Sequence, residues 1–164
     1  MRIITVKKKE EEKFLRKKTT SFDFSKFNAG EMRALLFDMK ATMREANGVG
    51  LSANQVGHAF RMFVAEVPSE NGKKFYALFN PHIEKKSAET RIEEEGCLSI
   101  PGVYGQVERS YQVTIVADDK SGKKIKIKTW GLLARIFQHE VDHLDGILFI
   151  DRAKNTRVIS KNEN

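Results

Sequence analysis

Residues 130–146 read W-G-L-L-A-R-I-F-Q-H-E-V-D-H-L-D-G, and this segment carries the strongest structural signal in the chain. Its apolar residues recur at intervals of three and four, which predicts an amphipathic helix from about Trp130 to Leu144. Gly146 is a typical residue for the end of such a helix. The predicted inward side mixes apolar and polar residues, namely Leu132, Leu133, Ile136, Phe137, Glu140 and His143. We therefore expect a core helix that brings polar groups into the interior.

Two histidines lie on one face of this helix. His139 and His143 are four residues apart, so both imidazoles can bind one metal ion. Glu140 follows the first histidine and can reach a water molecule on that metal. Buried polar side chains without a partner would be costly, so a chance match explains the pattern poorly. The segment therefore predicts a metal site.

A third ligand has to come from elsewhere in the chain. The extended zincin pattern needs a histidine six residues past the second one, where this chain has Phe149. Glu163 has the spacing of a thermolysin-like ligand, but it lies in a polar tail and is rejected. His58 and His82 are interpreted as surface or loop residues. Cys97 is the best candidate, because a thiolate and two imidazoles leave one coordination position open for water, as in catalytic sites.

A second amphipathic helix is predicted nearer the N-terminus, over about residues 31–47, where methionines and leucines recur at helical spacing. Asn28 or Ser25 could cap its start, and Gly48 suits its end. Residues 48–57 contain three glycines, which predicts a loop with backbone exposed for close approach.

Short strands account for most of the remaining pattern. They are predicted at Arg61–Val67, Phe75–Phe79, Tyr111–Ala117 and Lys123–Thr129. The second strand is expected to close at Asn80-Pro81, and the last two are expected to form a hairpin. The predicted class is α+β, with mainly antiparallel sheets packed around a central metal-binding helix and with an N-terminal amphipathic helix.

Length and composition favour one domain. The chain has 164 residues and a mass of 18.7 kDa, so we expect a single catalytic domain over 1–164, with peripheral basic or polar ends at 1–13 and 153–164. One cysteine excludes an intrachain disulfide. No apolar run approaches the roughly 20 residues that cross a bilayer, and the first residues do not form a signal peptide. The expected compartment is the cytoplasm.

The chain is basic, with a net charge of +7. Residues 1–18 hold eight basic and three acidic residues. They are interpreted as a solvated, partly frayed end, with attraction to a polyanion such as RNA as the alternative.

Three motifs together resemble those of the peptide deformylases. They are G-V-G-L-S-A-N-Q at 48–55, E-G-C-L-S at 95–99 and Q-H-E-V-D-H-L at 138–144, in the order and at spacings similar to those of the family. Further similarity lies in Phe79-Asn80-Pro81, in Val107-Glu108-Arg109 and in the segment 146–152. The resemblance covers roughly residues 14–152. Agreement of three separate motifs is far more specific than the H-E-x-x-H element alone.

This resemblance implies a hydrolase that removes the formyl group from the N-terminal formylmethionine of newly synthesised proteins. It implies Fe²⁺ as the native metal, with Zn²⁺, Ni²⁺ or Co²⁺ as substitutes, whereas Cys-His₂ ligation on general grounds suggests Zn²⁺. The site residues that it implies are Cys97, His139 and His143 as metal ligands, Glu140 as general acid/base, the Gln55 side chain and the Leu98 backbone N–H as oxyanion donors, and Gly50 as a backbone partner of the substrate.

These roles fit the chemistry of a formamide. A bound metal makes hydroxide from water near neutral pH, and Glu140 can pass a proton from that water to the leaving amine. Leu132 and Ile136 are candidates for the formylmethionine pocket, or plain core residues. Asp142 lies off the ligand face, and we expect it to pair with Arg109 as a support behind the metal site.

The chain departs from the common family pattern at a few positions. Ser52 and Asn54 stand where alanine and proline are frequent, and Tyr104 stands where some members have an arginine near the substrate. The segment Asn155–Asn164 is polar and lacks a long amphipathic helix. Members that dock on the ribosome through such a helix are therefore a poor guide to this tail.

Two other functions remain open at this point. One is a general metallopeptidase, and the other is a metal-stabilised module that binds the ribosome or RNA. For the deformylase, the expected partners are N-formylmethionyl peptides and nascent chains, with a possible transient contact to the ribosome and none to DNA or a membrane. A bacterial cytoplasmic location is expected in preference to the mature form of an organellar protein.

Overall fold

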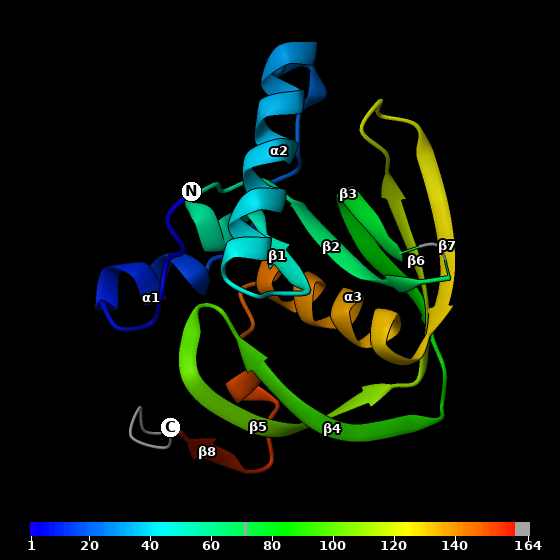
Figure 1. The fold of residues 1–164 in the computed structure, drawn as a ribbon. Helices are drawn as coiled ribbons and strands as arrows, with labels where there is room; N and C mark the ends of the chain where they lie inside the picture. Colours follow the sequence, from blue (N-terminus) through cyan, green and yellow to red (C-terminus); the bar gives the residue numbers. More distant parts are fainter. Residues whose placement is uncertain (71, 160–164) are drawn as a thin grey trace.

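A computed structural model describes residues 1–70 and 72–159. Two antiparallel sheets enclose one helix: a five-stranded sheet in the order β1-β2-β3-β6-β7 and a three-stranded sheet in the order β4-β5-β8 (Figure 1). The elements are α1 (Lys9–Leu15), η1 (Phe24–Lys26), α2 (Ala29–Glu45), β1 (Gly50–Ser52), η2 (Ala53–Val56), β2 (Met62–Ser69), β3 (Gly72–Lys86), β4 (Thr90–Cys97), β5 (Ile100–Ser110), β6 (Gln112–Asp118), β7 (Lys124–Trp130), α3 (Gly131–Leu144), η3 (Phe149–Asp151) and β8 (Thr156–Val158). The predicted α+β class is confirmed.

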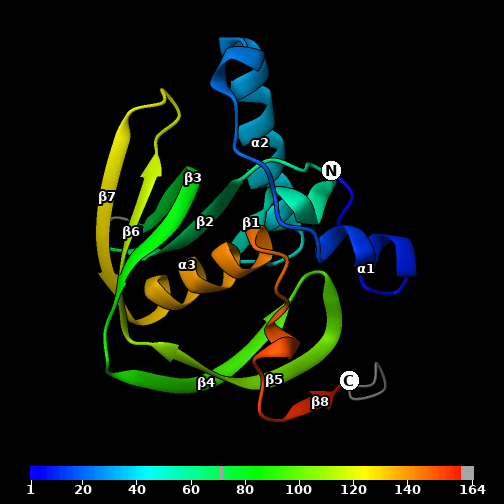
Figure 2. The ribbon, with the colours of Figure 1, turned by 180° about the vertical axis from the view of Figure 1, so that it is seen from behind.

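Helix α3 is the central element, as predicted, and lies between the two sheets in both Figure 1 and the reverse view of Figure 2. Its apolar side packs on the five-stranded sheet, where Ile136, Phe137 and Leu144 join residues of β2, β3 and β6 in one core cluster. From Ala134 onward the helix is buried almost all round. Leu132 departs from its predicted inward position and is 52% exposed, in the first turn of the helix.

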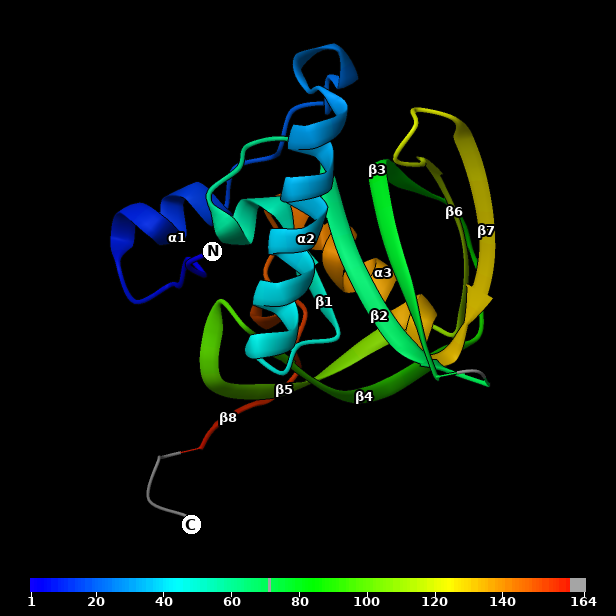
Figure 3. The same cartoon turned by 45° about the horizontal axis from the view of Figure 1, so that its top comes forward.

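Helix α2 covers the other face of β1 and β2 (Figure 3). Of the two predicted caps, Asn28 is the one that the structure shows. Its side chain accepts from the backbone N–H of Glu31, while the Glu31 side chain accepts from the backbone N–H of Asn28. The predicted stop at Gly48 is wrong by one residue. Asn47 takes the left-handed conformation with φ +55°, a conformation that asparagine tolerates better than most residues.

The predicted loop at 48–57 is largely regular structure. Residues 50–52 form β1, which pairs with β2 in the register Gly50↔Ala65, and η2 follows directly. Three residues are too few to produce a periodic sequence signal, so only the partner strand defines this element. Gly57, with φ +92°, ends η2.

Strand β3 was predicted to end at Asn80-Pro81. In the structure it continues to Lys86. The ladder with β6 shifts register between Phe79 and His82, and this bulge accommodates the proline, which cannot donate a ladder hydrogen bond. The hairpin of β6 and β7 agrees with its prediction to within a residue at each end.

The interpretation of residues 1–18 as a frayed, solvated end is wrong. Ile4 and Leu15 are buried, and the backbone N–H groups of Ile4 and Val6 donate to the carbonyls of Gln55 and Ser99. The lysines of this segment remain on the surface, so its buried apolar side chains and these backbone hydrogen bonds hold it in place.

At the other end of the chain, residues 156–158 form β8, which pairs with β5, in a segment predicted to be a peripheral polar end without a long amphipathic helix. Glu163 lies outside the described residues. Within residues 1–70 and 72–159, none of the helices has the length and apolar character that crossing a membrane requires.

Candidate active site

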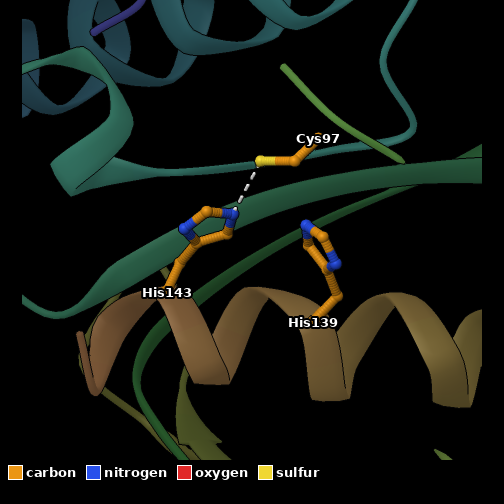
Figure 4. Close-up of side chains that lie close together, drawn as sticks. All are labelled: Cys97, His139 and His143. Carbon is orange, nitrogen blue, oxygen red and sulfur yellow. Dashed lines mark hydrogen bonds between the residues drawn. The ribbon is translucent and has the colours of Figure 1, made fainter. Parts of the chain in front are cut away.

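Three potential metal ligands converge between α3 and the β4–β5 hairpin. His139 and His143 are one turn apart on α3, and Cys97 ends β4 immediately before a two-residue turn (Figure 4). Cys97 Sγ lies 3.1 Å from His143 Nε2, and one ligand atom from each of the three residues lies within 4.8 Å of the others. Ligands of one tetrahedral ion are about 3.6 Å apart by the usual bond lengths, so this donor set fits a metal after small side-chain shifts.

The charges of these groups favour ligation. Burial raises the pKa of the Cys97 thiol, but the positive charge of His143 and hydrogen bonds from both histidines outweigh it and lower the pKa to about 5. Burial alone would lower the pKa of His139, whereas hydrogen bonds to Cys97 and Glu95 raise it to about 10. Both shifts favour the thiolate form of Cys97 and the protonated form of His139. A cation such as Zn²⁺ or Fe²⁺ can replace the proton.

Glu140 is buried beside this group, with its side chain held from strand β1. It is only 3% exposed, and burial raises the pKa of its carboxyl. The Ser52 hydroxyl lies 2.6 Å from Glu140 Oε2 and donates to it. The other carboxylate oxygen faces Gly50, where a Cβ would lie 2.9 Å from Glu140 Cδ. Gly50 is thus the residue that leaves room for the carboxylate.

Gln55 presents an oriented amide to the same site. Its carbonyl oxygen accepts from the backbone N–H of Ser52 at 2.8 Å, which turns the amide nitrogen toward Ser99 Oγ at 3.1 Å and Cys97 Sγ at 3.5 Å. The side chain is 2% exposed and lines the cleft. Leu98 lies in the turn after Cys97 and also lines the cleft.

A cleft of about 520 Å³ opens onto these groups, a volume typical of small-ligand sites. Both predicted pocket residues line the cleft. Ile136 is buried, and Leu132, one helical turn earlier on α3, is exposed. Tyr104 and the backbone of residues 48–50 form other parts of the wall. The cleft therefore has apolar walls and a polar floor.

Buried ion pairs support the histidine ligand from behind. Glu95 Oε2 lies 3.0 Å from His139 Nδ1 and also receives Arg109 Nη2 at 2.9 Å. Arg109 further pairs with Asp142, so the predicted pairing is confirmed. The Arg152 guanidinium and the Arg109 charge lower the pKa of Asp142 against the opposing effect of burial. The chain of contacts fixes the His139 ring so that Nε2 faces the site.

Sequence reasoning missed four members of the site. Glu95 stood inside a recognised motif but received no role, and Ser52 was noted only as a departure from the family. Arg135 donates to Glu95 at 2.7 Å, and Arg152 donates twice to Asp142. Arg135 precedes His139 by four residues, so its shared helix face was the available signal. For Arg152, the available signal was its place in the segment 146–152, which resembles the family.

Comparison with known proteins identifies the family. The family model for polypeptide deformylase matches residues 2–158. The chain belongs to this family. The peptide deformylase of Symbiobacterium thermophilum is 49% identical over 154 residues, which are 93% of this chain and 68% of that protein. Deformylases are hydrolases that remove the N-terminal formyl group from nascent proteins, and this is the activity of the chain.

Solved deformylase structures share the fold. The class I type b peptide deformylase of Acinetobacter baumannii, bound to Met-Ala-Ser, superposes with a TM-score of 0.84 at 33% identity, covering 93% of this chain and 97% of that one. The enzyme of Synechococcus elongatus in complex with actinonin gives 0.83 at 35% identity, with coverage of 94% and 79%. The deformylase family is metal-dependent, and Cys97, His139 and His143 form a group able to hold the ion.

Proposed function

We propose that Cys97, His139 and His143 hold one divalent metal ion and that Glu140 moves the protons in the deformylation reaction. The observation that carries this proposal is the convergence of the three donors with a buried carboxylate at the floor of one cleft. A metal bound there supplies a Lewis acid that activates water for attack on the formyl carbonyl. A thiolate with two imidazoles leaves an open coordination position for this purpose.

Glu140 is the general base and then the general acid in this proposal. Ser52 occupies Oε2, so Oε1, the oxygen next to Gly50, is the atom that takes the proton from water and returns it to the leaving amine. The burial that raises the pKa of Glu140 brings its proton affinity closer to that needed at neutral pH.

Gln55 and Leu98 are the proposed oxyanion donors. The fixed Gln55 carboxamide directs its Nε2 protons toward the Cys97 side of the cleft, and Leu98 lies in the adjoining turn. Donors held in place before the reaction stabilise the developing charge without reorganisation, and one such donor contributes about 3–4 kcal/mol.

The peptide is proposed to add to the free edge of β1. This strand is at the end of the five-stranded sheet, and its residue Gly50 lines the cleft. An extended peptide can use such an edge for main-chain hydrogen bonds. Ile136 is proposed as part of the pocket for the first side chain, with Leu132 at the rim. The Acinetobacter baumannii relative, solved with bound Met-Ala-Ser, supports a peptide of this kind as the ligand.

Fe²⁺ is the proposed native metal, with Zn²⁺, Ni²⁺ or Co²⁺ as substitutes, and anaerobic purification followed by metal analysis tests it. The single-domain organisation over 1–164, the bacterial cytoplasmic location and a transient contact with the ribosome stay predictions. The basic lysines near the N-terminus favour the last of these.

The decisive assay is formate release from formyl-Met-Ala-Ser by wild type, Glu140→Gln and the surface control Glu10→Gln. We expect Glu140→Gln to lose about two to four orders of magnitude in turnover while keeping the metal, and Glu10→Gln to match wild type. Near-normal turnover of Glu140→Gln at full metal content would refute the assigned role. Cleavage of unformylated Met-Ala-Ser would instead indicate a general peptidase.

A further inference from the structure

Two buried polar atoms next to the metal site lack a hydrogen-bond partner. Within residues 1–70 and 72–159, three buried side-chain atoms have none: Asn54 Oδ1, Asp118 Oδ1 and His143 Nδ1. Asp118 Oδ1 lies 2.7 Å from Lys124 Nζ and is thus ion-paired. An unpaired buried donor or acceptor costs about 1–3 kcal/mol, so the two remaining atoms require an explanation.

The orientation of the Asn54 amide is fixed by its neighbours. Asn54 Nδ2 donates to the backbone carbonyl of His143 at 2.6 Å and lies 3.5 Å from that of Leu15. Two carbonyl oxygens on this side require the nitrogen there, so the amide cannot be flipped. Asn54 Oδ1, on the other side, is an acceptor without a donor, in a residue that already contacts His143.

His143 lacks the opposite partner: in the part of the chain that the structure describes, its Nδ1 has no hydrogen-bond acceptor. Its Nε2 faces Cys97 Sγ, and Figure 4 shows the second ring nitrogen turned away from Cys97 and His139. When Nε2 binds a metal, the proton of the neutral ring resides on Nδ1, which then has to donate. His139 meets the same requirement through Glu95, with 3.0 Å between Nδ1 and Oε2. Among the described residues, none donates to or accepts from His143 Nδ1.

We propose that Asn54 Oδ1 accepts the Nδ1 proton of His143 in the metal-loaded enzyme, directly or through one water molecule. Asn54 is then a positioning residue that fixes the tautomer and ring orientation of a ligand, as Glu95 does for His139. This inference rests on the proposed ligand set. Each of the two atoms lacks a partner, and each supplies what the other needs: Asn54 Oδ1 is an acceptor, and His143 Nδ1 is the donor of the metal-bound ring. Asn54 already holds the backbone of His143 through Nδ2.

The test uses the zinc-loaded protein labelled with ¹⁵N-histidine. We expect a slowly exchanging Nδ1–H resonance for His143 in wild type, because its proton is buried and bonded. In Asn54→Leu, which has a similar shape but no acceptor, the resonance should exchange faster or disappear. Competition with a chelator should show zinc affinity lowered by about 10–100-fold, the usual effect of losing a partner behind a ligand.

A matched control separates this effect from general damage to the end of α3. Thr19 Oγ1 donates to the neighbouring carbonyl of Leu144 at 2.9 Å, and Thr19→Val removes that bond without touching the ring of His143. We expect Thr19→Val to keep wild-type zinc affinity and the resonance. A rapidly exchanging His143 Nδ1–H in wild type overturns the inference without any variant, as does unchanged zinc affinity in Asn54→Leu. If zinc leaves the His143 ring signals of wild type unchanged, the ligand set itself is wrong.

Discussion

Gly50 lies against the carboxylate of Glu140, so closely that a Cβ at position 50 would lie 2.9 Å from Glu140 Cδ. Real Cβ atoms do not approach other heavy atoms to this distance. The backbone of β1 and the proposed acid/base group therefore share a space that only glycine permits. The same strand holds the carboxylate from its other side through Ser52.

Gly50→Ala is expected to displace the Glu140 carboxylate and lower turnover at least tenfold, with metal content unchanged. Metal content is expected to stay unchanged because the three heavy atoms nearest to the added methyl group all belong to Glu140, which is not a proposed metal ligand. Formate release and metal analysis on the same preparation check this. The control is Gly30→Ala on α2, which has only the flexible Asn28 side chain within reach and should keep full activity. Equal activities of the two variants would contradict the steric argument.

Arg109→Leu is expected to destabilise the protein by about 3–5 kcal/mol, because it leaves the buried carboxylates of Glu95 and Asp142 without their shared cation. Urea denaturation of the metal-free protein measures this. Arg152→Leu is the comparison. Its side chain is 40% exposed and contacts only Asp142 of this pair, so the loss should be clearly smaller. Similar losses in both variants would show that Arg109 is not the centre of the network.

The helix that carries the ligands could be predicted because its signal is local. His139 and His143 need only the helical repeat to meet, and the apolar positions around them identify the core face. The third ligand, Cys97, followed from the chemistry of the other two and from the resemblance to a family. The capping of α2 by Asn28 was predictable for the same reason, since all its partners lie within three residues.

Other features depend on residues far apart in the chain and could not be predicted. Strand β1 exists only through its pairing with β2, and β3 passes Pro81 only because β6 accepts a bulge there. The sequence places Arg135 and Arg152 near the site, but their pairing with Glu95 and Asp142 becomes visible only in the folded chain. The places of these strands and side chains are set by tertiary contacts, which leave no periodic pattern in the sequence.

The stability of the protein should fall with acidity through Glu66. Hydrogen bonds from Arg44 hold the pKa of Glu66 below its ordinary value against the effect of burial. A lowered folded-state pKa adds stability above the unfolded pKa of about 4.3, and that part is lost as the pH falls through the folded value. Glu66→Gln lacks this contribution. Its urea midpoint should lie below that of wild type at pH 7, and the difference should shrink as the pH falls below the unfolded pKa and through the lowered folded-state pKa of Glu66.

Arg44→Leu tests the same pair from the other side. Without Arg44, Glu66 loses the main cause of its lowered pKa, so the difference between wild type and this variant should also shrink toward pH 3. If the urea midpoints of both variants stay at a constant distance below that of wild type from pH 7 to pH 3, another carboxylate controls the loss of stability in acid.

Peroxide is expected to inactivate the enzyme through Cys97. The thiol is the single cysteine of the chain, lines the cleft and has its pKa lowered to about 5 by the neighbouring histidines despite burial. Thiolate character and access govern oxidation, and the sulfinic and sulfonic products are irreversible. Loss of activity should therefore follow the mass increase of the peptide that contains Cys97, and thiol reductants should not restore it. With Fe²⁺, which reacts with peroxide, the loss should be faster than with redox-inert Zn²⁺.

The assignment to Cys97 can be separated from damage elsewhere because only one sulfur is a thiol. Peptide mapping distinguishes oxidation of Cys97 from oxidation of the five methionines, among which Met39, Met43 and Met62 are fully buried. Cys97→Ser replaces the thiolate by a poor neutral ligand and should lose most of the metal and activity before any peroxide is added. A serine variant with a full metal complement and normal turnover would show that Cys97 is not a ligand. Peroxide inactivation with Cys97 still reduced would place the sensitive group on a methionine or on the metal.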